Sequence, residues 1–366
     1  LWITTPEGIN PIAPAMLKAC ESVGIPAYDD LNGELMESEG GAAIANVRIK
    51  DGRRVSLAKD YVYPALKRPN MTLLTGAEVL ELMMEGTKVV GVKFVKDGEV
   101  MEIGATKKVV LSAGAINTPK ILMHSGIGDS KELSSHGIKT VVNLPGVGKN
   151  FQDHVLLGGC VWEYKEAIPP ANNLAEATFF WKSNSALDTP DLQPFQIEVP
   201  YGSEVTGQQF KLPPNSWTIA PGLVRPKSRG RVYLASANPK DLMRIDGGHL
   251  REQADVDALI RGVELCREIG NSDVMKPYVK REVMPGKMDR KTLTDFVRNS
   301  TTTYFHQSGS CKMGRDEMAV VDGKLAVRGV EGLMIADASV MPRVVTSNTM
   351  AATVVIGERA ADILIG

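Results

Sequence analysis

The sequence predicts a mixed α/β fold, and three observations lead to this prediction. Short apolar runs with turn signals between them fill residues 71–110, the pattern of β-strands joined by tight turns. The stretch 107–128 reads as a strand, a glycine turn and the start of a helix. Apolar residues at helical spacing mark an amphipathic helix at about 252–270. With 366 residues, the chain is long enough for two domains or one large one.

The first 66 residues predict a helix, a loop and a second short helix. Asn10 and Pro11 open the first helix and Gly24 closes it, with apolar residues at helical spacing between them. Residues 30–46 are rich in glycine, and we expect a loop or lid there. Residues 51–66 are typical of a turn followed by a short helix.

The stretch GAINTPKILMHSGIG (114–128) is the most informative part of the chain. The run KKVVLSAG (107–114) predicts the strand that leads into it. We expect Thr118 to be the N-cap of the following helix and Pro119 its first residue. A glycine turn before a helix N-terminus directs backbone N–H groups and the positive end of the helix dipole toward an anionic ligand, typically a phosphate.

The second half of the chain contains further strands and two longer helices. A strand is expected at RGRVYLAS (229–236). The amphipathic helix near 252–270 has one apolar face, formed by Val256, Leu259, Ile260, Val263, Cys266 and Ile269. A last helix is expected from about Thr349 to Ile365.

Composition and charge argue against several classes of function. A net charge of −1 gives no reason to expect nucleic acid or an anionic membrane as partner. The four cysteines form no CxxC pair, so we expect neither a zinc site nor a disulfide framework, and we assign no metal site. Scattered free cysteines suit a reducing compartment, which predicts a cytoplasmic location. No run of 18 or more apolar residues is present, so no transmembrane span is expected.

The start of the chain and a missing motif raise the question of an additional segment. The opening residues, LWITTPEGINP, have neither an initiator methionine nor the features of a signal peptide. The chain also has no GxGxxG fingerprint, the motif that opens dinucleotide-binding domains. Two alternatives stay open. The chain is a mature or cloned form, or an upstream segment is missing here or lies on another chain.

Five blocks of the sequence resemble the glucose–methanol–choline (GMC) family of FAD-dependent oxidoreductases. The first is the stretch 114–128, which resembles the second family signature at Gly114, Ala115, Thr118, Pro119, Ile121, Leu122, Ser125, Gly126, Ile127 and Gly128. The other four are LPGVGKNFQDH (144–154), FHQSGSCKMG (305–314), LMIADASVMPR (333–343) and SNTMAATVVIGERAADIL (347–364). They occur in family order and cover nearly the whole chain, with the weakest resemblance in the middle.

The resemblance implies a discontinuous architecture. Residues 60–155 and 301–366 would form a Rossmann-like FAD-binding α/β domain whose first βαβ unit is absent from this chain. Residues 156–300 would form an α+β substrate domain on an antiparallel sheet, and residues 1–59 a helix and lid on the substrate side. The resemblance implies FAD as the cofactor. It also implies an N-terminal companion segment or chain that supplies the dinucleotide-binding motif.

His306 is the candidate catalytic base. Oxidation of an alcohol removes a proton from oxygen and a hydride from carbon, and the flavin accepts the hydride. A histidine suits the proton because its pKa lies near the working pH. His306 stands at the histidine of the family block HPxGxCxMG, with Gln307 in place of the usual proline. The structural alternative is a loop histidine bonded to a backbone carbonyl.

Asn348 is the candidate partner of the base. The family places a histidine or an asparagine at this position, where the amide can hold the substrate oxygen by a hydrogen bond. The structural alternative is a helix N-cap, a position that asparagine favours. Family members often carry a proline four residues later, where this chain has Ala352.

Further residues are assigned to the FAD site through the same resemblance. Asp337 would meet the pyrophosphate–ribityl region, and Ala338 would allow close approach of the backbone. Gly114 and Ala115 would pass the ADP half, and the backbone of Val79 would meet the adenine. The last block adds Thr349 and Met350. The alternatives are ordinary turns at 114–115 and 337–338, and a β-core role for Val79.

Three other features are read as structural. His154 matches the family block, and we interpret it as a structural residue. Cys311 is read as a small buried hydrophobe rather than a nucleophile. PGVGKN (145–150) lacks the GxxxxGK[ST] spacing of a phosphate-binding loop.

The leading functional hypothesis is FAD-dependent oxidation of an alcohol to a carbonyl, with oxygen or another molecule as the electron acceptor. A primary alcohol fits the resemblance, with aromatic or heteroaromatic examples such as benzylic, furanic or pyridoxine-like alcohols. One alternative is a hydroxynitrile lyase of the same fold. Such lyases tend to carry a second histidine at the position of Asn348, which argues against this alternative. The other is an inactive fragment, or one half of a two-chain enzyme.

Overall fold

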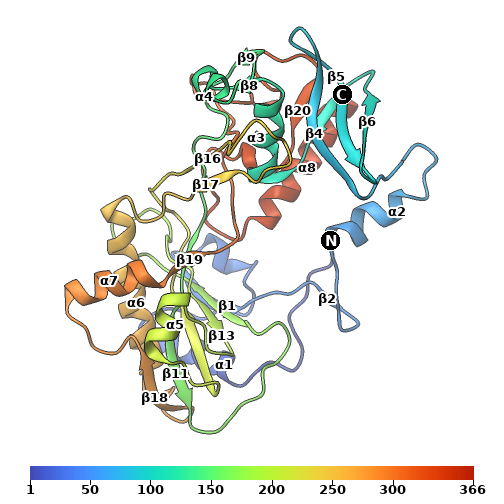
Figure 1. The fold of residues 1–366 in the computed structure, drawn as a ribbon. Helices are drawn as coiled ribbons and strands as arrows, with labels where there is room; N and C mark the ends of the chain where they lie inside the picture. Colours follow the sequence, from blue (N-terminus) through green and yellow to red (C-terminus); the bar gives the residue numbers. More distant parts are fainter. The chain divides into compact units, whose positions relative to one another are not determined.

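The computed structural model describes residues 1–366, and the chain divides into two compact units (Figure 1). Unit 1 contains Leu1–Leu73, Val155–Arg225 and Glu252–Tyr304. Unit 2 is likewise assembled from three separate stretches, which are Leu74–His154, Pro226–Arg251 and Phe305–Gly366. Both units mix helices and strands, so the predicted α/β class is confirmed.

Unit 1 is built on a six-stranded antiparallel sheet with the strand order β1-β12-β13-β14-β11-β18. Its strands are β1 (Gly41–Ile44), β11 (Cys160–Tyr164), β12 (Ala177–Phe180), β13 (Phe195–Ile197), β14 (Ser216–Ala220) and β18 (Val279–Met284). In the register of β11 and β14, Trp162 lies opposite Trp217, and the two rings stack with centroids 4.7 Å apart. All five residues of β14 are buried, as expected for a central strand covered on both faces. The predicted antiparallel sheet is therefore confirmed.

Helices α1 and α6 pack against each other and against this sheet. The predicted apolar face of the 252–270 helix is buried in α6. The remaining helices of unit 1 are short, and α5 and α7 begin with side-chain caps from Ser203 and Asp289. The helical segments are α1 (Ile12–Ser22), the 3-10 turn η1 (Glu34–Glu37), the π-turn η2 (Ala58–Val62), α2 (Tyr63–Ala65), α5 (Glu204–Phe210), α6 (Gln253–Gly270) and α7 (Arg290–Ser300).

Two smaller sheets complete unit 1. One has three strands in the order β15-β10-β19, and the other is the hairpin β2-β3. Their bounds are β2 (Ile49–Lys50), β3 (Arg53–Arg54), β10 (Val155–Leu157), β15 (Gly222–Leu223) and β19 (Thr301–Thr303).

The prediction of a loop or lid at residues 30–46 is wrong for its second half. Residues 41–44 form β1, which pairs with β12 at the edge of the main sheet. The glycine at 41 reflects packing rather than a flexible turn, because a Cβ there would lie 2.4 Å from the ring of Tyr28. Glycine content alone does not separate these two situations.

Unit 2 contains four small sheets. The antiparallel sheet β4-β5-β6 follows the predicted hairpins, whereas β7 pairs with β20 and β8 with β9 in parallel. The fourth sheet is the antiparallel pair β16-β17. The strands are β4 (Ala77–Glu85), β5 (Lys88–Lys96), β6 (Glu99–Gly104), β7 (Val109–Leu111), β8 (Ile127–Gly128), β9 (Val142–Asn143), β16 (Arg231–Tyr233), β17 (Arg244–Asp246) and β20 (Leu333–Ile335).

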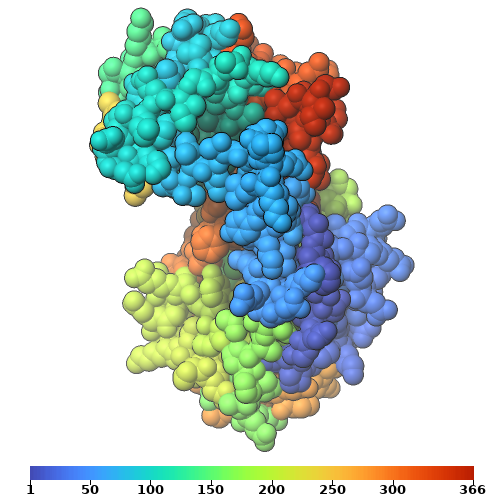
Figure 2. Space-filling model, turned by 90° about the vertical axis from the view of Figure 1, so that its right-hand side faces the viewer, coloured from blue at the N-terminus to red at the C-terminus, as the bar shows by residue number.

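The helices of unit 2 are α3 (Gly114–His124), α4 (Ser130–Ser135), the 3-10 turn η3 (Ala338–Val340) and α8 (Met350–Ile365). Helix α3 follows β7 directly, which is the strand–turn–helix arrangement that the sequence predicts. Its buried face joins β7 and β20 in the main apolar cluster of the unit, which includes Leu111, Leu122, Leu333 and Ile335. Helix α8 lies at the surface, at the red end of the scale in Figure 2, and Ala360 is its only buried residue.

The predicted start of α3 is wrong, since the helix begins at Gly114 and Pro119 lies inside it. A proline has no N–H, so the carbonyl of Ala115, four residues earlier, loses its helical partner. The hydroxyl of Ser310 donates a hydrogen bond to that carbonyl at 2.6 Å. Thr118 is not the N-cap, because it lies within the helix. Its hydroxyl accepts a hydrogen bond from the N–H of Ala113 and donates one to Asp337.

The two units divide the chain differently from the sequence-based domains. Residues 226–251 belong to unit 2, whereas the sequence prediction placed all of 156–300 in one substrate domain. Which ligand each unit holds stays a prediction. No helix in the structure has both the length and the apolar character needed to cross a membrane.

Candidate active site

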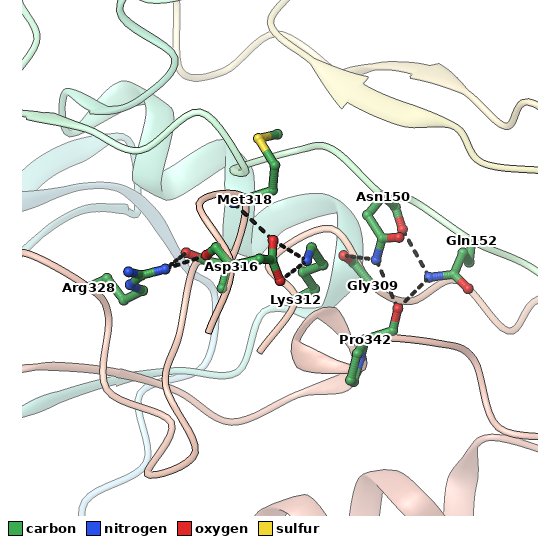
Figure 3. Close-up of polar contacts among 9 residues, drawn as sticks. Asn150, Gln152, Gly309, Lys312, Asp316, Met318, Arg328 and Pro342 are labelled. Atoms are coloured by element: carbon green, nitrogen blue, oxygen red, sulfur yellow. Dashed lines mark hydrogen bonds and ion pairs between the residues drawn. The ribbon is translucent and has the colours of Figure 1, made fainter. Parts of the chain in front are cut away.

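Three of the sequence blocks meet in unit 2 through backbone and amide hydrogen bonds (Figure 3). The side-chain amide of Asn150 donates to the carbonyls of Gly309 and Pro342, at 3.1 and 3.2 Å. The amide of Gln152 donates to the carbonyl of Pro342 at 3.2 Å. Blocks 144–154, 305–314 and 333–343 are thereby fastened to one another, although about 190 residues separate the first from the last.

The loop that carries the candidate base is fixed at both ends. At its C-terminal end, Lys312 and Asp316 form an ion pair of 2.6 Å, and the carbonyl of Asp316 accepts a hydrogen bond from Arg328 (Figure 3). At its N-terminal end, Asp153 accepts hydrogen bonds from the backbone N–H of His306 at 2.9 Å and from the side chain of Gln307 at 3.2 Å.

His306 lies between a buried histidine and Asn348. Its Nδ1 atom is 2.9 Å from Nδ1 of His154, and the two rings are nearly perpendicular at 87°. On the other side of the ring, Nε2 of His306 lies 3.5 Å from Nδ2 of Asn348. Nε2 of His154 lies 2.8 Å from the carbonyl oxygen of Val345. The structure thus brings together the two predicted catalytic residues, 42 positions apart in the chain.

Burial lowers the pKa of His306 to about 4, because the apolar surroundings penalise the charged imidazolium. The residue before it, Phe305, has a φ of 61°, in the left-handed region that large side chains rarely adopt. This backbone turn directs the following imidazole into the protein while Phe305 itself is 77% exposed. The lowered pKa means that the ring of His306 is neutral at neutral pH and a weaker base than a free histidine.

Asn348 is not the N-cap of the last helix. The N-cap position of α8 is Thr349, which has helical backbone angles and makes no side-chain capping bond. Asn348 is exposed, and its amide faces the imidazole of His306. The capping alternative therefore does not describe the position.

Four of the residues assigned to the cofactor lie together at the start of α3 and at η3, namely Gly114, Ala115, Asp337 and Ala338. The carboxylate of Asp337 is held inside the protein, where it accepts hydrogen bonds from the N–H of Gly114 at 2.9 Å, the hydroxyl of Thr118 at 2.6 Å and the N–H of Ser339 at 2.8 Å. This carboxylate links α3 to the turn that contains Ala338. Ala338 is only partly buried, and its carbonyl accepts a hydrogen bond from Gly309.

The start of α3 leaves open space beside the backbone of Gly114. The N-cap residue Ala113 makes no side-chain cap, but the carboxylate of Asp337 accepts a hydrogen bond from the N–H of Gly114, so the first N–H of the helix is already paired with a negative group. Gly114 has a φ of 80°, and no atom lies within 4 Å of the place where a Cβ would stand. A bound group can therefore approach the backbone closely at this point.

The remaining assigned residues are placed as follows. Val79 lies on β4 opposite Phe94 of β5, and its side chain packs against the main cluster of unit 2. Thr349 and Met350 begin α8, immediately after Asn348. The adenine role of Val79 and the flavin roles of Thr349 and Met350 stay predictions.

Sequence reasoning missed Asp153 and underestimated His154. Both belong to the QDH end of block 144–154, where two polar residues stand together before a buried strand. His154 is completely buried, and its two ring nitrogens contact the ring of His306 and the carbonyl of Val345. A histidine preceded by an aspartate was the available signal in the sequence, but its partner lies 152 residues away.

Cys311 agrees with its interpretation as a small buried hydrophobe. All four cysteines are free and buried. Burial raises the pKa of the Cys311 thiol, which makes it a poor nucleophile. No group of three or more His, Cys, Asp or Glu side chains in residues 1–366 is arranged to hold a metal ion.

Known proteins resemble this chain over nearly its whole length. Two family models described as GMC oxidoreductase match residues 2–156 and 226–357. Oxygen-dependent choline dehydrogenase of Pseudomonas fluorescens (strain SBW25) is 37% identical over 98% of this chain and 68% of its own length. The protein named alcohol dehydrogenase [acceptor] of Pseudomonas putida is 33% identical over all of this chain and 70% of its own.

Solved structures show the same fold. Pyridoxine 4-oxidase from Mesorbium loti superposes with a TM-score of 0.92 at 30% identity, over 98% of this chain and 71% of that one. Formate oxidase from Aspergillus oryzae RIB40, a protein whose FAD is modified, superposes with a TM-score of 0.87 at 25% identity, over 99% and 72%. A flavin in that relative agrees with the cofactor that the sequence predicts. By its matched regions, its curated relatives and its fold, this chain belongs to the GMC oxidoreductase family.

Proposed function

We propose that this chain carries the catalytic pair of an FAD-dependent enzyme that oxidises an alcohol to a carbonyl compound. The observation that carries this proposal is the position of His306, a neutral and partly buried imidazole whose Nε2 atom faces the amide of Asn348. The names of the relatives support it, since choline, an alcohol and pyridoxine are all hydroxyl compounds.

In the proposed mechanism the substrate hydroxyl binds next to Nε2 of His306 and the side-chain amide of Asn348. The amide donates a hydrogen bond to the substrate oxygen and orients it. Nε2 of His306 accepts the hydroxyl proton as the carbonyl forms. Bound FAD supplies the acceptor for the hydride that leaves the substrate carbon. Atoms and electrons balance, because one proton goes to His306 and two electrons leave with the hydride.

The FAD would be held by unit 2. Gly114 and Ala115 lie at the start of α3, where the carboxylate of Asp337 accepts a hydrogen bond from the N–H of Gly114, and Ala338 follows Asp337 in the chain. The carboxylate of Asp337 is already bonded to the protein, so we assign the contact at this position to the backbone. Val79, Thr349 and Met350 complete the proposed set.

We further propose a companion segment that supplies the dinucleotide-binding motif. The relatives are longer than this chain, which covers 68% and 70% of the first two, and the chain itself has no GxGxxG sequence. Helix α8 supports this idea, since Val355 is 65% and Ile365 86% exposed within an apolar helix. FAD bound stoichiometrically to this chain as a single species would contradict it.

The substrate class and the electron acceptor are finer proposals. We favour a primary alcohol, with aromatic or heteroaromatic alcohols first among those to test. Oxygen and another acceptor are both represented in the names of the relatives, which include an oxidase and an acceptor-linked dehydrogenase. A cytoplasmic location also stays a proposal, which rests on the free cysteines.

A visible absorbance experiment tests the main proposal. Anaerobic addition of alcohols to the FAD-loaded protein, assembled with the proposed companion segment, should bleach the flavin, and the His306→Ala variant should slow this step by roughly 10²–10⁴-fold with FAD still bound. Reduction by alcohol at the wild-type rate in the variant would show that His306 is not the base. A yellow protein that is not bleached but releases cyanide from a cyanohydrin would indicate the lyase. Re-oxidation by air or only by a dye distinguishes oxidase from dehydrogenase.

A further inference from the structure

The second histidine of the site, His154, lies behind the candidate base and makes two ring contacts. Its side chain has 0% exposure. Nδ1 of His154 is 2.9 Å from Nδ1 of His306, and Nε2 of His154 is 2.8 Å from the carbonyl oxygen of Val345. The chain of contacts therefore runs from a backbone carbonyl through two imidazoles to Asn348.

The carbonyl of Val345 decides which nitrogen of His154 carries the proton. A backbone carbonyl only accepts hydrogen bonds, so Nε2 of His154 must donate and carries the hydrogen. The 2.9 Å contact between the two Nδ1 atoms needs an acceptor on one ring, and we assign the neutral ring to His154. In a neutral imidazole the other nitrogen is an acceptor. Nδ1 of His154 therefore presents a lone pair to His306.

The same reasoning applies to the ring of His306. Nδ1 of His306 must donate to the lone pair of His154, so the proton of the neutral His306 resides on Nδ1. Nε2 of His306 is then left as an acceptor, and this is the atom that faces the amide of Asn348 at 3.5 Å. An amide nitrogen donates, so the contact with Asn348 is consistent with this assignment. If the proton of His306 were on Nε2 instead, this N–H would face the N–H of the Asn348 amide, and Nε2 would have no lone pair to accept a substrate proton.

We propose that His154 is a positioning residue that fixes His306 in the tautomer with its lone pair on Nε2, through the hydrogen bond between the two Nδ1 atoms. The assignment rests on the proposed function of His306 as base. His154 touches neither substrate nor cofactor in this role. It acts by keeping the base in its reactive form before the substrate binds.

The arrangement holds the tautomer but does not conduct protons. When Nε2 of His306 takes a proton, Nδ1–H still donates to His154, and this hydrogen bond becomes charge-assisted and stronger. The proton cannot continue through His154, because the Val345 carbonyl at the end of the chain is not a base. It must therefore leave from the Nε2 side of His306.

The residue next to His154 also holds the backbone of the loop that carries His306. Asp153, the residue before His154, accepts hydrogen bonds from the backbone of His306 and from Gln307. Residues 153 and 154 therefore hold both the backbone and the ring of the base. The contacts of His306 include the ring of His154, the amide of Asn348 and, at its backbone N–H, the carboxylate of Asp153.

Histidine ¹⁵N NMR tests the proposal without any activity measurement. The chain has only five histidines, so the ring signals can be assigned with single-site variants. At neutral pH the wild-type protein should show His306 protonated on Nδ1 and His154 protonated on Nε2. A His306 that carries its proton on Nε2 would overturn the proposal before any variant is studied.

Three variants separate positioning from a merely structural role. His154→Leu removes the acceptor, and the Nε2–H form of His306 should become populated. His154→Asn places an amide oxygen near the former Nδ1 position, so it should restore the Nδ1–H form. His136→Asn, at the end of α4, is the matched loss of a histidine elsewhere in unit 2 and should leave the tautomer unchanged. An unchanged tautomer in His154→Leu would overturn the proposal.

Kinetics of the FAD-loaded protein then links the tautomer to the reaction. In His154→Leu we expect the limiting rate of flavin reduction to fall roughly tenfold or more, with the half-saturating alcohol concentration little changed and partial recovery in His154→Asn. If the tautomer changes and the rate does not, the positioning role of His154 is supported and the proposed base role of His306 fails. If the wild-type tautomer is the one that we assign and the rate follows it across the variants, both are supported.

Discussion

At the scale of single residues, the site depends on the protonation of one imidazole. The free side chain of histidine has a pKa of 6.5, and burial lowers that of His306 to about 4. The unfolded chain therefore binds a proton at this position at a higher pH than the folded protein does. Stability from this group is fully present above pH 6.5 and is lost as the pH falls from 6.5 toward 4.

This shift gives a pH prediction. In His306→Asn, the decline in the free energy of unfolding between pH 6.5 and 4 should be less steep than in the wild type, because the variant lacks the group that gains a proton on unfolding. Urea denaturation at a series of pH values measures both proteins. Parallel stability curves for the two would show that His306 is not held neutral by the fold.

Asn348 gives a second prediction at this scale. Asn348→Ala should lower the rate of flavin reduction by roughly 10²-fold, the typical effect of losing one preorganised donor, while FAD retention changes less. Stopped-flow reduction and equilibrium FAD binding measure the two effects separately. Asn348→His is the informative companion variant, since the family also uses histidine at this position. Loss of FAD with unchanged chemistry would assign Asn348 a structural role instead.

At the scale of elements, α3 shows why the local sequence pattern misleads at one point. Thr118-Pro119 has the composition of a helix start, yet the helix begins five residues before the proline. The carbonyl of Ala115 is satisfied by Ser310, which lies 195 residues further along the chain. A distant hydroxyl thus replaces the N–H that proline lacks, and no pattern within the helix reveals it.

This replacement predicts a stability effect. Ser310→Ala should destabilise the protein by roughly 1–3 kcal/mol, because it leaves the buried carbonyl of Ala115 without a partner. In a Pro119→Ala background the same change should cost less, since the substituted residue offers a backbone N–H to that carbonyl. Ser308→Ala is the matched control, because that buried hydroxyl has no hydrogen-bond partner. Equal losses in both backgrounds, measured by urea denaturation, would contradict the assignment.

Most other elements follow from local pattern. The hairpins of 77–104, the helix α6 and the strand–turn–helix arrangement of β7 and α3 appear where periodicity and turn residues predict them, whereas the apolar run 71–76 forms no strand. Strand β1 is an exception, because, like the start of α3, it depends on a contact with a distant part of the chain. Its pairing with β12 joins Gly41 to Phe180, a contact that glycine content does not indicate.

At the scale of the whole molecule, each unit is assembled from three stretches of chain. The apolar cluster of unit 2 combines Leu111 and Leu122 from one stretch, Leu234 from the second, and Leu333 and Ile335 from the third. Neither unit can therefore be obtained as one continuous segment.

This architecture leads to the last prediction. Residues 74–154 expressed without residues 305–366 should not unfold cooperatively, because β7 loses its parallel partner β20 and the cluster loses its C-terminal members. Near-UV circular dichroism and urea denaturation check this, with the whole chain as the reference. A cooperative transition of the isolated segment would show that its core is complete without the C-terminal stretch.

By itself, the sequence determined the family, the α/β class and most of the elements, and it predicted the pair His306 and Asn348, because motifs and periodicity are local properties of the chain. The tertiary structure decided that Asp153 holds the loop of the base, that Ser310 completes α3, and that His154 rather than solvent faces Nδ1 of His306. These contacts join residues more than 150 positions apart. A hydrogen bond over such a separation constrains only two positions in space, so it leaves no repeating pattern along the sequence from which it could be predicted.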